Sequence, residues 1–577
     1  MSDEDFVSVD ELVVAAAIRY SDVIGCSPYV TASSHSPHTW VFPMRALLIY
    51  PLFPKSFWSF DKAIELAGRK AILPPLGLVT VAGILPDEWE LRLVDRNVEA
   101  LTEADWDWAE LVIFSGMIVQ KPDMLAQIKE AKRRNKLVAV GGPYATALPH
   151  EVTEAGADFR VLDEGEITLP MLVEAIERGE TEGTLRALER PDVSTSPVPR
   201  FDLLKLDAYS EMAIQFSRGC PFQCEFCDII VLYGRKPRTK SPEQLIAELE
   251  CLYQLGWRRS IFMVDDNFIG NKRNVKLMLK ALVPWMKEKG YPFTFSTEAS
   301  VDLAQDQELM DLMTECNFGA VFLGVETPDE ASLALTQKFQ NNRDPLSESI
   351  HKIASSGIRV MAGFIIGFDG EKKGAGDRIV QFVEKCSVPT ALFSMLQALP
   401  DTALWIRLEK EGRLLAGKET ANIHQTTLMN FVPTRPVEEV AQEYVDAFWN
   451  LYDPQKYLDR CYRHYRILGE APCHNENKRP PKPKSAKEPF NWHLLKALAI
   501  VCWKQGVERE TRSTFWIYLW EMIRHNRGGV ASYLTVCAQI EHFLEYRQIV
   551  KDQIESQIED VIATRETEVE TEAAIAA

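Results

Sequence analysis

Long apolar runs, basic charge and a regular cysteine framework are all missing from this sequence. No stretch reaches the roughly 18 consecutive apolar residues that a membrane-spanning helix needs, so we expect no transmembrane segment. The formal net charge is −19, whereas a nucleic-acid partner would require a basic face, so we expect no nucleic acid. The eleven cysteines lack the dense, even-numbered spacing of secreted disulfide proteins. Because the first residues are acidic where a secretory signal is basic, we expect a reducing, cytoplasmic location.

The length of the chain, 577 residues, suggests about three domains. Composition and periodicity change at several points that we interpret as boundaries. We predict an N-terminal extension at 1–43, an α/β domain at 44–185, a proline-rich linker at 186–205, a second α/β domain at 206–429, a helical domain at 430–560 and an acidic tail at 561–577. The tail has no clear apolar stripe, so we expect it to be frayed or disordered.

Both α/β domains show short β-rich runs separated by helix-length segments, which favours parallel sheets covered by helices. In the first domain the expected strands are 46–50, 91–95, 111–115 and 137–140, as in a doubly wound, Rossmann-like fold. In the second domain the expected strands are 213–216, 260–264, 293–297, 320–325, 359–366 and 391–397. Six βα units suit a partial (β/α)6 TIM-like barrel, whose working residues lie at the carboxyl ends of the strands.

Helix signals support this division. Ser241, Pro242 and Gln244 predict an N-cap, a first-turn proline and a capping-box glutamine for one barrel helix. Beyond residue 430 the sequence has long amphipathic stretches rich in aromatics, which predict a helical C-terminal domain. The apolar segment 515–522 is short, and we expect it to form a buried helix face rather than a membrane-surface anchor.

Three cysteines carry the chemistry. Cys220, Cys224 and Cys227 stand at positions i, i+4 and i+7 in a loop directly after the first barrel strand, close enough to surround one metal centre. A zinc site is the structural alternative, but zinc usually requires a fourth Cys or His, and the nearest histidines are His150 and His351. A four-iron cluster held by three cysteines leaves one iron open to bind a ligand.

This segment resembles the radical S-adenosylmethionine (SAM) superfamily, whose CxxxCxxC motif matches the three cysteines, with Phe226 as the aromatic residue before the last one. The resemblance implies that Cys220, Cys224 and Cys227 are both the metal ligands and the catalytic residues. It also implies a 4Fe-4S cluster whose open iron binds SAM and whose electron cleaves it to a 5'-deoxyadenosyl radical. An electron donor such as flavodoxin or ferredoxin is then a required partner.

Later strands carry further matches to the superfamily, which imply cofactor-binding residues. At the end of the second strand Asp266 and Asn267 occupy the place of the methionyl-amine site, although the usual Gly-Gly-Glu is absent. Glu298 and Glu326 end the third and fourth strands, where the superfamily contacts the ribose and the methionyl part. The fifth strand matches the GxIxG segment that lies along the adenine, with Gly363, Ile365 and Gly367. A β-bulge is the alternative explanation for strand glycines.

The first domain resembles the cobalamin-binding domain that precedes the radical module in one subgroup. The matches are 74–78, the strand ends at Asp95 and Ser115, 141–143 and 164–166. They imply that Ser115, Gly141, Gly142 and Gly165 contact cobalamin, because glycines past strand ends allow close backbone approach. The loop at 50–54 has no histidine, so we expect no protein imidazole on cobalt. A flavodoxin-like domain with ordinary tight turns is the alternative.

The likeness continues through 57–60, 234–240, 399–404 and 408–414, and so covers residues 44 to about 460. For the basic run 234–240 we expect a solvated loop, with a lid or an anion contact as the alternative. The subgroup includes hopanoid and bacteriochlorophyll radical methylases with helical C-terminal domains. It implies a cobalamin-dependent radical SAM enzyme that methylates an unactivated carbon of a small-molecule substrate, for example a lipid or a tetrapyrrole.

Two alternatives remain open from the sequence. One is a cobalamin-assisted radical rearrangement, cyclisation or other C–H functionalisation without methyl transfer, which shares every motif named above. The other is a non-catalytic cobalamin-binding sensor, against which the three intact cysteines speak. The aromatic C-terminal helices could line a substrate pocket, but we expect packed core.

Overall fold

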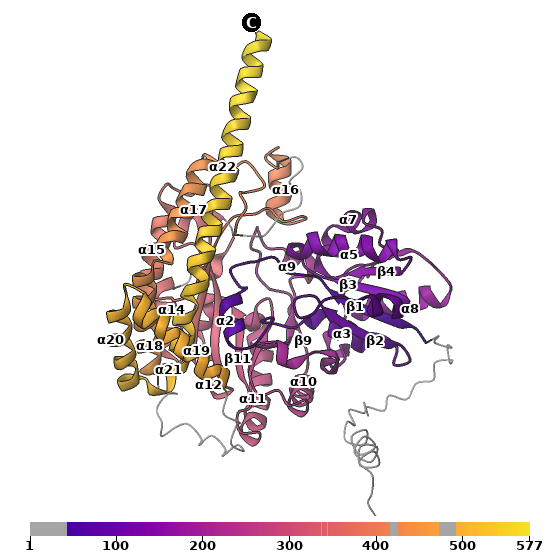
Figure 1. Cartoon of the computed structure of the whole chain (residues 1–577), viewed down its shortest axis with the longest axis horizontal. Helices are drawn as coiled ribbons and strands as arrows, with labels where there is room; N and C mark the ends of the chain where they lie inside the picture. The colour runs from indigo at the N-terminus through magenta and orange to yellow at the C-terminus, as the bar shows by residue number, and fades with distance from the viewer. Residues whose placement is uncertain (1–42, 336, 343, 416–424, 472–491, 577) are drawn as a thin grey trace, which may run out of the picture. The chain divides into compact units, whose positions relative to one another are not determined.

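Two parallel sheets and a group of C-terminal helices make up the described fold. The computed structural model describes residues 43–335, 337–342, 344–415, 425–471 and 492–576 (Figure 1). The predicted N-terminal extension, apart from its last residue, lies outside these ranges.

The first sheet contains six parallel strands in the order β2-β1-β3-β4-β5-β6. Their bounds are β1 Arg45–Tyr50, β2 Glu90–Asp95, β3 Leu111–Ser115, β4 Leu137–Gly141, β5 Phe159–Val161 and β6 Gly183–Leu185. The four predicted strands are therefore confirmed. Strands β5 and β6 were not predicted, because each has only three residues and a polar residue, Arg160 or Thr184, in its middle.

Helices cover both faces of this sheet, as expected when strands are apolar on both sides. They are α2 Asp61–Leu66, α3 Leu76–Ile84, α4 Glu103–Trp108, α5 Lys121–Arg133, α6 Gly142–Ala147, α7 Pro149–Glu154 and α8 Gly165–Glu177. Side chains of α5, α6 and α7 share one buried cluster with β1, β3 and β4. Helices α3 and α8 contact each other, and Figure 1 shows α3 and α5 on opposite sides of the strands.

The second sheet also has six parallel strands, in the order β14-β13-β12-β11-β10-β7. Their bounds are β7 Met212–Ile214, β10 Ser260–Met263, β11 Thr294–Ala299, β12 Phe318–Glu326, β13 Arg359–Ile366 and β14 Ala391–Met395. All six predicted barrel strands are present. The first one ends two residues early, because the backbone N–H of Phe216 donates to the Asp265 carboxylate at 2.8 Å instead of joining the ladder.

Helices alternate with the strands of the second sheet. They are α9 Ile229–Leu232, α10 Pro242–Gln254, α11 Lys272–Glu288, α12 Gln307–Glu315, α13 Glu330–Leu335, α14 Leu346–Ser355 and α15 Ala375–Cys386. A small antiparallel pair, β8 Ser217–Arg218 and β9 Arg238–Thr239, flanks the cysteine loop. The arrangement is the predicted partial barrel.

The start of α10 follows the sequence signals only in part. The Ser241 hydroxyl caps the helix by accepting from the Gln244 N–H at 3.2 Å, and Pro242 is its first residue. The predicted capping box is wrong, because the Gln244 side chain donates to the Ser196 carbonyl at 2.6 Å. This carbonyl belongs to the predicted linker, so a tertiary contact replaces the local one.

The C-terminal part is helical, as predicted. Its helices are α16 Ala403–Lys410, α17 Val437–Leu451, α18 Pro454–Gly469, α19 Trp492–Trp503, α20 Arg512–His525, α21 Val530–Ala538 and α22 Ile540–Ala576, with a π-helical turn at Lys504–Glu508. The predicted frayed tail at 561–577 instead continues α22 as far as Ala576. No helix in the described part of the chain is both long and apolar enough to cross a membrane.

Aromatic side chains of these helices form packed core, as expected. Phe57, from the segment between β1 and α2, contacts the rings of Phe448, Tyr452, Phe543 and Tyr546 at centroid distances of 5.0 to 6.5 Å. The expectation for 515–522 is only half correct. Helix α20 buries Phe515, Leu519 and Met522 but leaves other large apolar side chains of the segment exposed.

Candidate active site

The cysteine loop runs from β8 to α9, beyond the carboxyl end of β7. Cys220, Cys224 and Cys227 are all half-buried thiols without a disulfide. Backbone bonds shape the loop, since the Cys227 N–H donates to the Cys224 carbonyl and the Cys220 N–H to the Gly234 carbonyl, both at 3.2 Å. Burial raises the pKa of the Cys220 and Cys227 thiols, and the charge of Asp228 adds to the effect at Cys227. Such thiols keep their protons unless a metal displaces them.

Two buried amides point at the sulfurs. The Asn267 side-chain nitrogen lies 3.8 Å from Cys220 Sγ, and the Gln340 side-chain nitrogen lies 3.7 Å from Cys224 Sγ. Hydrogen bonds to sulfur are one means by which proteins set the potential of an iron–sulfur cluster. Asn267 was a predicted site residue, whereas Gln340 was missed because it lies 116 residues after its partner with no motif around it.

The donor set of the loop consists of three thiols. Across the described residues, no three His, Cys, Asp or Glu side chains converge as ligands for one metal ion. A structural zinc site requires a closed set of four ligands, whereas in a four-iron cluster each of three thiolates binds a different iron and one iron stays open. The three thiols therefore fit such a cluster by their number and chemistry.

Carboxylates gather at the neighbouring strand ends, where Asp266 and Glu298 are half-buried and Glu326 is buried. Asp266, after β10, accepts from the Gly219 N–H at 3.0 Å, next to Cys220. Burial, together with the charges of Asp265 and Asp228, raises the pKa of Asp266 to about 7. On β11, burial and the charges of Asp266 and Glu326 raise the pKa of Glu298 to about 7. This set of acids is therefore suited to a cationic ligand, whose charge would remove the cost of ionising them.

Glu326 ends β12 in a strained conformation. Its φ angle is +67°, a left-handed value that is rare for a residue other than glycine, and such strain concentrates at functional sites. Its carboxylate pairs with the buried Lys338 ammonium, which lies 6.0 Å from the centre of the Phe226 ring. Burial lowers the pKa of Lys338, but the charges of Glu326 and Cys224 outweigh burial and raise it overall. Lys338 was not foreseen from the sequence.

Asp265, next to Asp266, holds the start of the cysteine loop in place. Its carboxylate accepts from the Phe216 and Ser217 backbone N–H groups and from the Ser217 hydroxyl, at 2.6 to 2.8 Å. Burial raises the pKa of Asp265 to about 6. These bonds fasten the start of the cysteine loop to the end of β10.

The glycines of β13 are in close contact with other side chains. A Cβ atom on Gly363 would lie 2.9 Å from the Phe322 ring, and one on Gly367 would lie 2.7 Å from Met429 Sδ. Gly367 also has a φ of +99°, which a side chain would oppose. Ile365, between them, is half-buried. The space beside both glycines is thus limited in the structure by Phe322 and Met429.

At the first sheet, Ser115, Gly141 and Gly142 meet at the carboxyl ends of β3 and β4. Gly142 has a φ of +87°, and a Cβ there would lie 2.5 Å from Ser115 Oγ. Gly141 is close to the Val161 carbonyl. Gly165, at the start of α8, instead packs against Leu169 and Ile84.

Apolar side chains are exposed at the same sheet edge. Leu52 and Phe53, after β1, are each 38% exposed, and Met117, after β3, is 44% exposed. Their loop is held by the Gln120 side chain, which donates to the Pro51 carbonyl at 2.6 Å. An open, partly apolar edge of this kind fits a broad, flat ligand such as cobalamin. His150 lies exposed in α7, as expected of a surface residue.

Ion pairs join the first sheet to the cysteine loop. Arg218, two residues before Cys220, pairs with Glu164 and Glu166 at 2.8 Å, and Arg238 pairs with Glu164 at 2.7 Å. Burial alone would raise the pKa of Glu166, but the Arg218 guanidinium lowers it to about 2. The expectation of a solvated loop at 234–240 is therefore wrong for Arg238 and for Lys240, which pairs with the buried Glu248.

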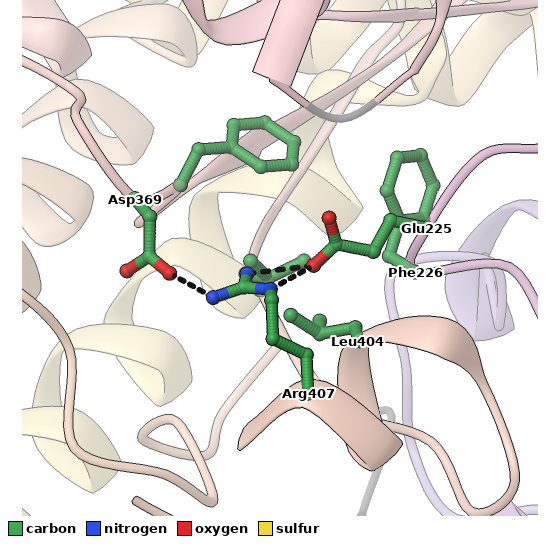
Figure 2. Close-up of a pocket in the computed structure, with 7 residues that line it drawn as sticks. Glu225, Phe226, Asp369, Leu404 and Arg407 are labelled. Atoms are coloured by element: carbon green, nitrogen blue, oxygen red, sulfur yellow. Dashed lines mark hydrogen bonds and ion pairs between the residues drawn. The ribbon is translucent and has the colours of Figure 1, made fainter. Parts of the chain in front are cut away.

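Helix α16 closes the other side of the loop. Figure 2 shows the Arg407 guanidinium between Glu225 and Asp369, beside a cavity lined by Phe226 and Leu404. Arg407 contacts Glu225 at 2.6 Å and Asp369 at 2.7 Å, and the Leu404 N–H donates to the Glu225 carbonyl at 2.9 Å. These contacts were missed, because no local motif marks an arginine 182 residues from its partner.

Comparisons with protein families divide the chain in the same way. Residues 64–173 match the model described as the B12 binding domain, and residues 214–383 match the radical SAM superfamily. Residues 402–556 match a domain of unknown function.

Relatives cover nearly the whole chain. It is 64% identical over 523 residues to an uncharacterized methyltransferase of Synechocystis sp. (strain ATCC 27184 / PCC 6803 / Kazusa), covering 91% of this chain and 96% of that protein. It is 33% identical over 509 residues to the hopanoid C-2 methylase of Rhodopseudomonas palustris (strain TIE-1), covering 87% and 93%. Among solved structures, the cobalamin-dependent SAM radical enzyme OxsB, with aqua-cobalamin and SAM bound, matches with a TM-score of 0.56 and 14% identity, covering 90% and 82%.

Proposed function

The chain belongs to the family of cobalamin-dependent radical SAM methyltransferases, and from this membership we propose which of its residues hold the cofactors and what it methylates. The family uses a 4Fe-4S cluster, SAM and cobalamin, as the sequence predicted. The two alternatives without methyl transfer are not favoured, since both relatives that cover the chain are named as methyl-transferring enzymes.

Cys220, Cys224 and Cys227 are proposed as the three cluster ligands. The observation that carries this proposal is the surroundings of the loop. The half-buried thiols of Cys220 and Cys224 accept amide hydrogen bonds from Asn267 and Gln340, and the Asp266 carboxylate lies next to Cys220. When bound, the cluster supplies the electron that cleaves SAM and cobalamin supplies the transferred methyl group. The protein's own part is to orient these groups and to keep water out.

Asp266, Glu298 and Glu326 are proposed to receive the positively charged methionyl part of SAM. Burial and the charges of Asp266 and Glu326 raise the pKa of Glu298, so a cation bound there would favour its ionised form, which supports this role; Glu326 is itself already paired with Lys338. Asn267 orients Cys220, and Phe226 forms the apolar wall on the far side of the cysteine loop. Gly363, Ile365 and Gly367 on β13 are proposed to lie along the adenine, which would require Phe322 to change its position.

Ser115, Gly141, Gly142 and Gly165 remain the proposed cobalamin contacts. The close packing of Gly142 against Ser115 supports a backbone surface without side chains at this edge. Leu52 and Phe53 occupy the loop in which other cobalamin domains carry a histidine, so we propose that cobalamin would be held here without a protein imidazole on cobalt. The predicted boundaries, 44–185 for cobalamin, 206–429 for the radical module and 430–560 for the helical domain, are kept as part of this proposal.

The proposed substrate is a small apolar molecule of the polycyclic lipid class, methylated at an unactivated carbon. The support is a relative named hopanoid C-2 methylase, to which this chain is 33% identical over a region that covers 93% of that relative's length. A flavodoxin or ferredoxin is proposed as electron donor. A cytoplasmic location is proposed because a reducing environment preserves the open thiols.

Anaerobic reconstitution tests this function. The full chain is loaded with iron, sulfide and cobalamin, and is then given reductant, polycyclic lipid extract and SAM with a deuterated methyl group. We expect 5'-deoxyadenosine together with a lipid that has gained the labelled methyl group. A rearranged lipid without label, or no nucleoside at all, would contradict the proposal.

A further inference from the structure

Helix α20 has apolar side chains both on the face that packs into the core and on a neighbouring exposed face. Phe515, Leu519 and Met522 point into the core. On the neighbouring face Trp520 is 62% exposed and Ile517 is 57% exposed, and Trp516 and Ile523 are also exposed. Residues 516, 520 and 523 are three and four positions apart, so they form one stripe along the helix. Packing within the chain explains only the inner face.

The stripe continues onto the preceding turn. The Trp516 indole N–H donates to the Gly506 carbonyl at 2.9 Å, which fastens α20 to the π-helical turn. Trp503, which is 58% exposed, and Val507 lie at this turn. The Trp503 indole N–H donates to the Glu508 carboxylate at 2.7 Å. We call the set the tryptophan face; it consists of Leu498, Trp503, Val507, Trp516, Ile517, Trp520 and Ile523.

Exposed cations stand at both ends of α20. Arg512 precedes the stripe, and Arg524 and Arg527 follow it. None of the three forms an ion pair with another described residue. Another exposed arginine, Arg178, does so with Glu174 and Glu180. The sequence before α19, at 478–487, is also basic, although it lies outside the described residues.

We propose that the tryptophan face docks on the surface of an anionic lipid bilayer. Indole rings combine an apolar body with an N–H donor, and arginines have long apolar stems below a charged head, which suits both to the bilayer interface. A helix with this pattern lies in the plane of the interface rather than crossing it. A second copy fits less well, because it would bring the same arginines against each other.

The acidic character of the whole chain sets the orientation. With a formal net charge of −19, most of the surface is repelled by anionic lipid. Arg512, Arg524 and Arg527 therefore give the tryptophan face an attraction to anionic lipid that most of the surface lacks. Such docking would hold the enzyme where an apolar substrate is dissolved, but it does not depend on the methyl-transfer chemistry.

Vesicle flotation of the full, reconstituted protein tests this docking. Wild-type protein is expected to float with vesicles of phosphatidylglycerol and phosphatidylcholine, and to do so less at high salt or with phosphatidylcholine alone. The double variant Ile517→Gln/Trp520→Gln is expected to bind at least about tenfold more weakly, because it loses two apolar anchors. Arg524→Glu/Arg527→Glu is expected to lose the preference for the anionic lipid.

Leu277→Gln serves as the matched control, because Leu277 is 54% exposed on α11, away from the tryptophan face in the sequence. It should float like wild type, and all variants should keep the wild-type thermal midpoint. Failure of the wild-type protein to float on anionic vesicles would overturn the proposal, as would equal flotation of the double variant. A dimer in solution that Trp520→Gln converts to monomer, without flotation, would identify a second copy as the occupant instead. Flotation requires no turnover, so its failure is separate from failure of the proposed function.

Discussion

At the residue scale, the amide of Gln340 is expected to tune the proposed cluster. An N–H donor 3.7 Å from Cys224 Sγ stabilises the more negative, reduced state. A hydrogen bond of about 1 kcal/mol corresponds to roughly 40 mV for one electron, so Gln340→Leu should lower the reduction potential by that order. A redox titration followed by electron paramagnetic resonance measures it. Gln305→Leu, which changes a surface glutamine bonded to Asp344, should leave the potential unchanged.

The pKa of Glu298 predicts how SAM binding depends on pH. Glu298, with a pKa of about 7, is mostly protonated and neutral at pH 6 and mostly ionised at pH 8. Because only the ionised form attracts a cation, binding should tighten by about tenfold across this range. Glu298→Gln should weaken binding at pH 8 and make the profile shallower, leaving the part that Asp266, also with a pKa of about 7, contributes. Calorimetric titrations at the two pH values measure this, and an unchanged slope in the variant would count against the assigned role.

Site residues that belong to a recognisable motif could be predicted from the sequence, whereas site residues outside any motif could not. Asn267 stands beside the recognisable strand end, and the structure places its amide at Cys220. Gln340, Lys338 and Arg407 reach the site from segments more than a hundred residues away or from loops without a pattern. Their contacts depend on tertiary packing, which leaves no local periodicity in the sequence.

At the scale of elements, the loop after the first barrel strand depends on Arg218. Its guanidinium satisfies Glu164 and Glu166, whose side chains are only 3% and 5% exposed. Arg218→Met would leave the Glu166 carboxylate buried without a charged partner and Glu164 with Arg238 alone, which should lower the free energy of unfolding by about 3 kcal/mol. Urea denaturation measures the change. Arg178→Met, in an exposed pair, should change stability by less than about 0.5 kcal/mol.

The contact between Arg218 and Glu166 should also make the stability of the fold depend on pH. Glu166 has a pKa of about 2 in the folded chain, below the ordinary value of 4.5. A carboxyl with a lowered folded pKa stabilises the fold above its unfolded pKa, and this contribution is lost as pH falls from about 5 towards 2. The loss should be smaller in Arg218→Met, as followed by thermal midpoints between pH 5 and 3. An equal loss in both proteins would contradict the assignment.

Strand prediction succeeded where a run is mostly apolar, including the three-residue β7, and failed for β5 and β6, which are short and have a polar middle residue. The run in β3 is apolar except for Ser115 at its end, and the run in β13 has no polar residue after Arg359, so their bounds match the prediction. Strands β5 and β6 have three residues each and are held by their neighbours. Helix α22 continues beyond its apolar stripe, which the sequence interpretation took as the end of regular structure.

At the scale of the whole molecule, Phe57 links the N-terminal sheet to the C-terminal helices. Its fully buried ring lies in a cluster with Phe448, Tyr452 and Phe543. Phe57→Ala should cost about 3 to 5 kcal/mol, because the cavity is bounded by rings that cannot all collapse into it. In differential scanning calorimetry the variant should unfold at a lower temperature with a broader transition. Leu52→Ala, which changes an exposed side chain, should unfold like wild type.

The central claim is that three thiols in one loop hold the cluster that cleaves SAM. The most direct measurement is iron content and 5'-deoxyadenosine release after anaerobic reconstitution of Cys220→Ser, Cys224→Ser and Cys227→Ser. We predict that each substitution removes most of the bound iron and reduces nucleoside release to background, while Cys386→Ser, which changes a half-buried cysteine at the end of α15, retains both. Undiminished iron and nucleoside in any one of the three loop variants would contradict the account.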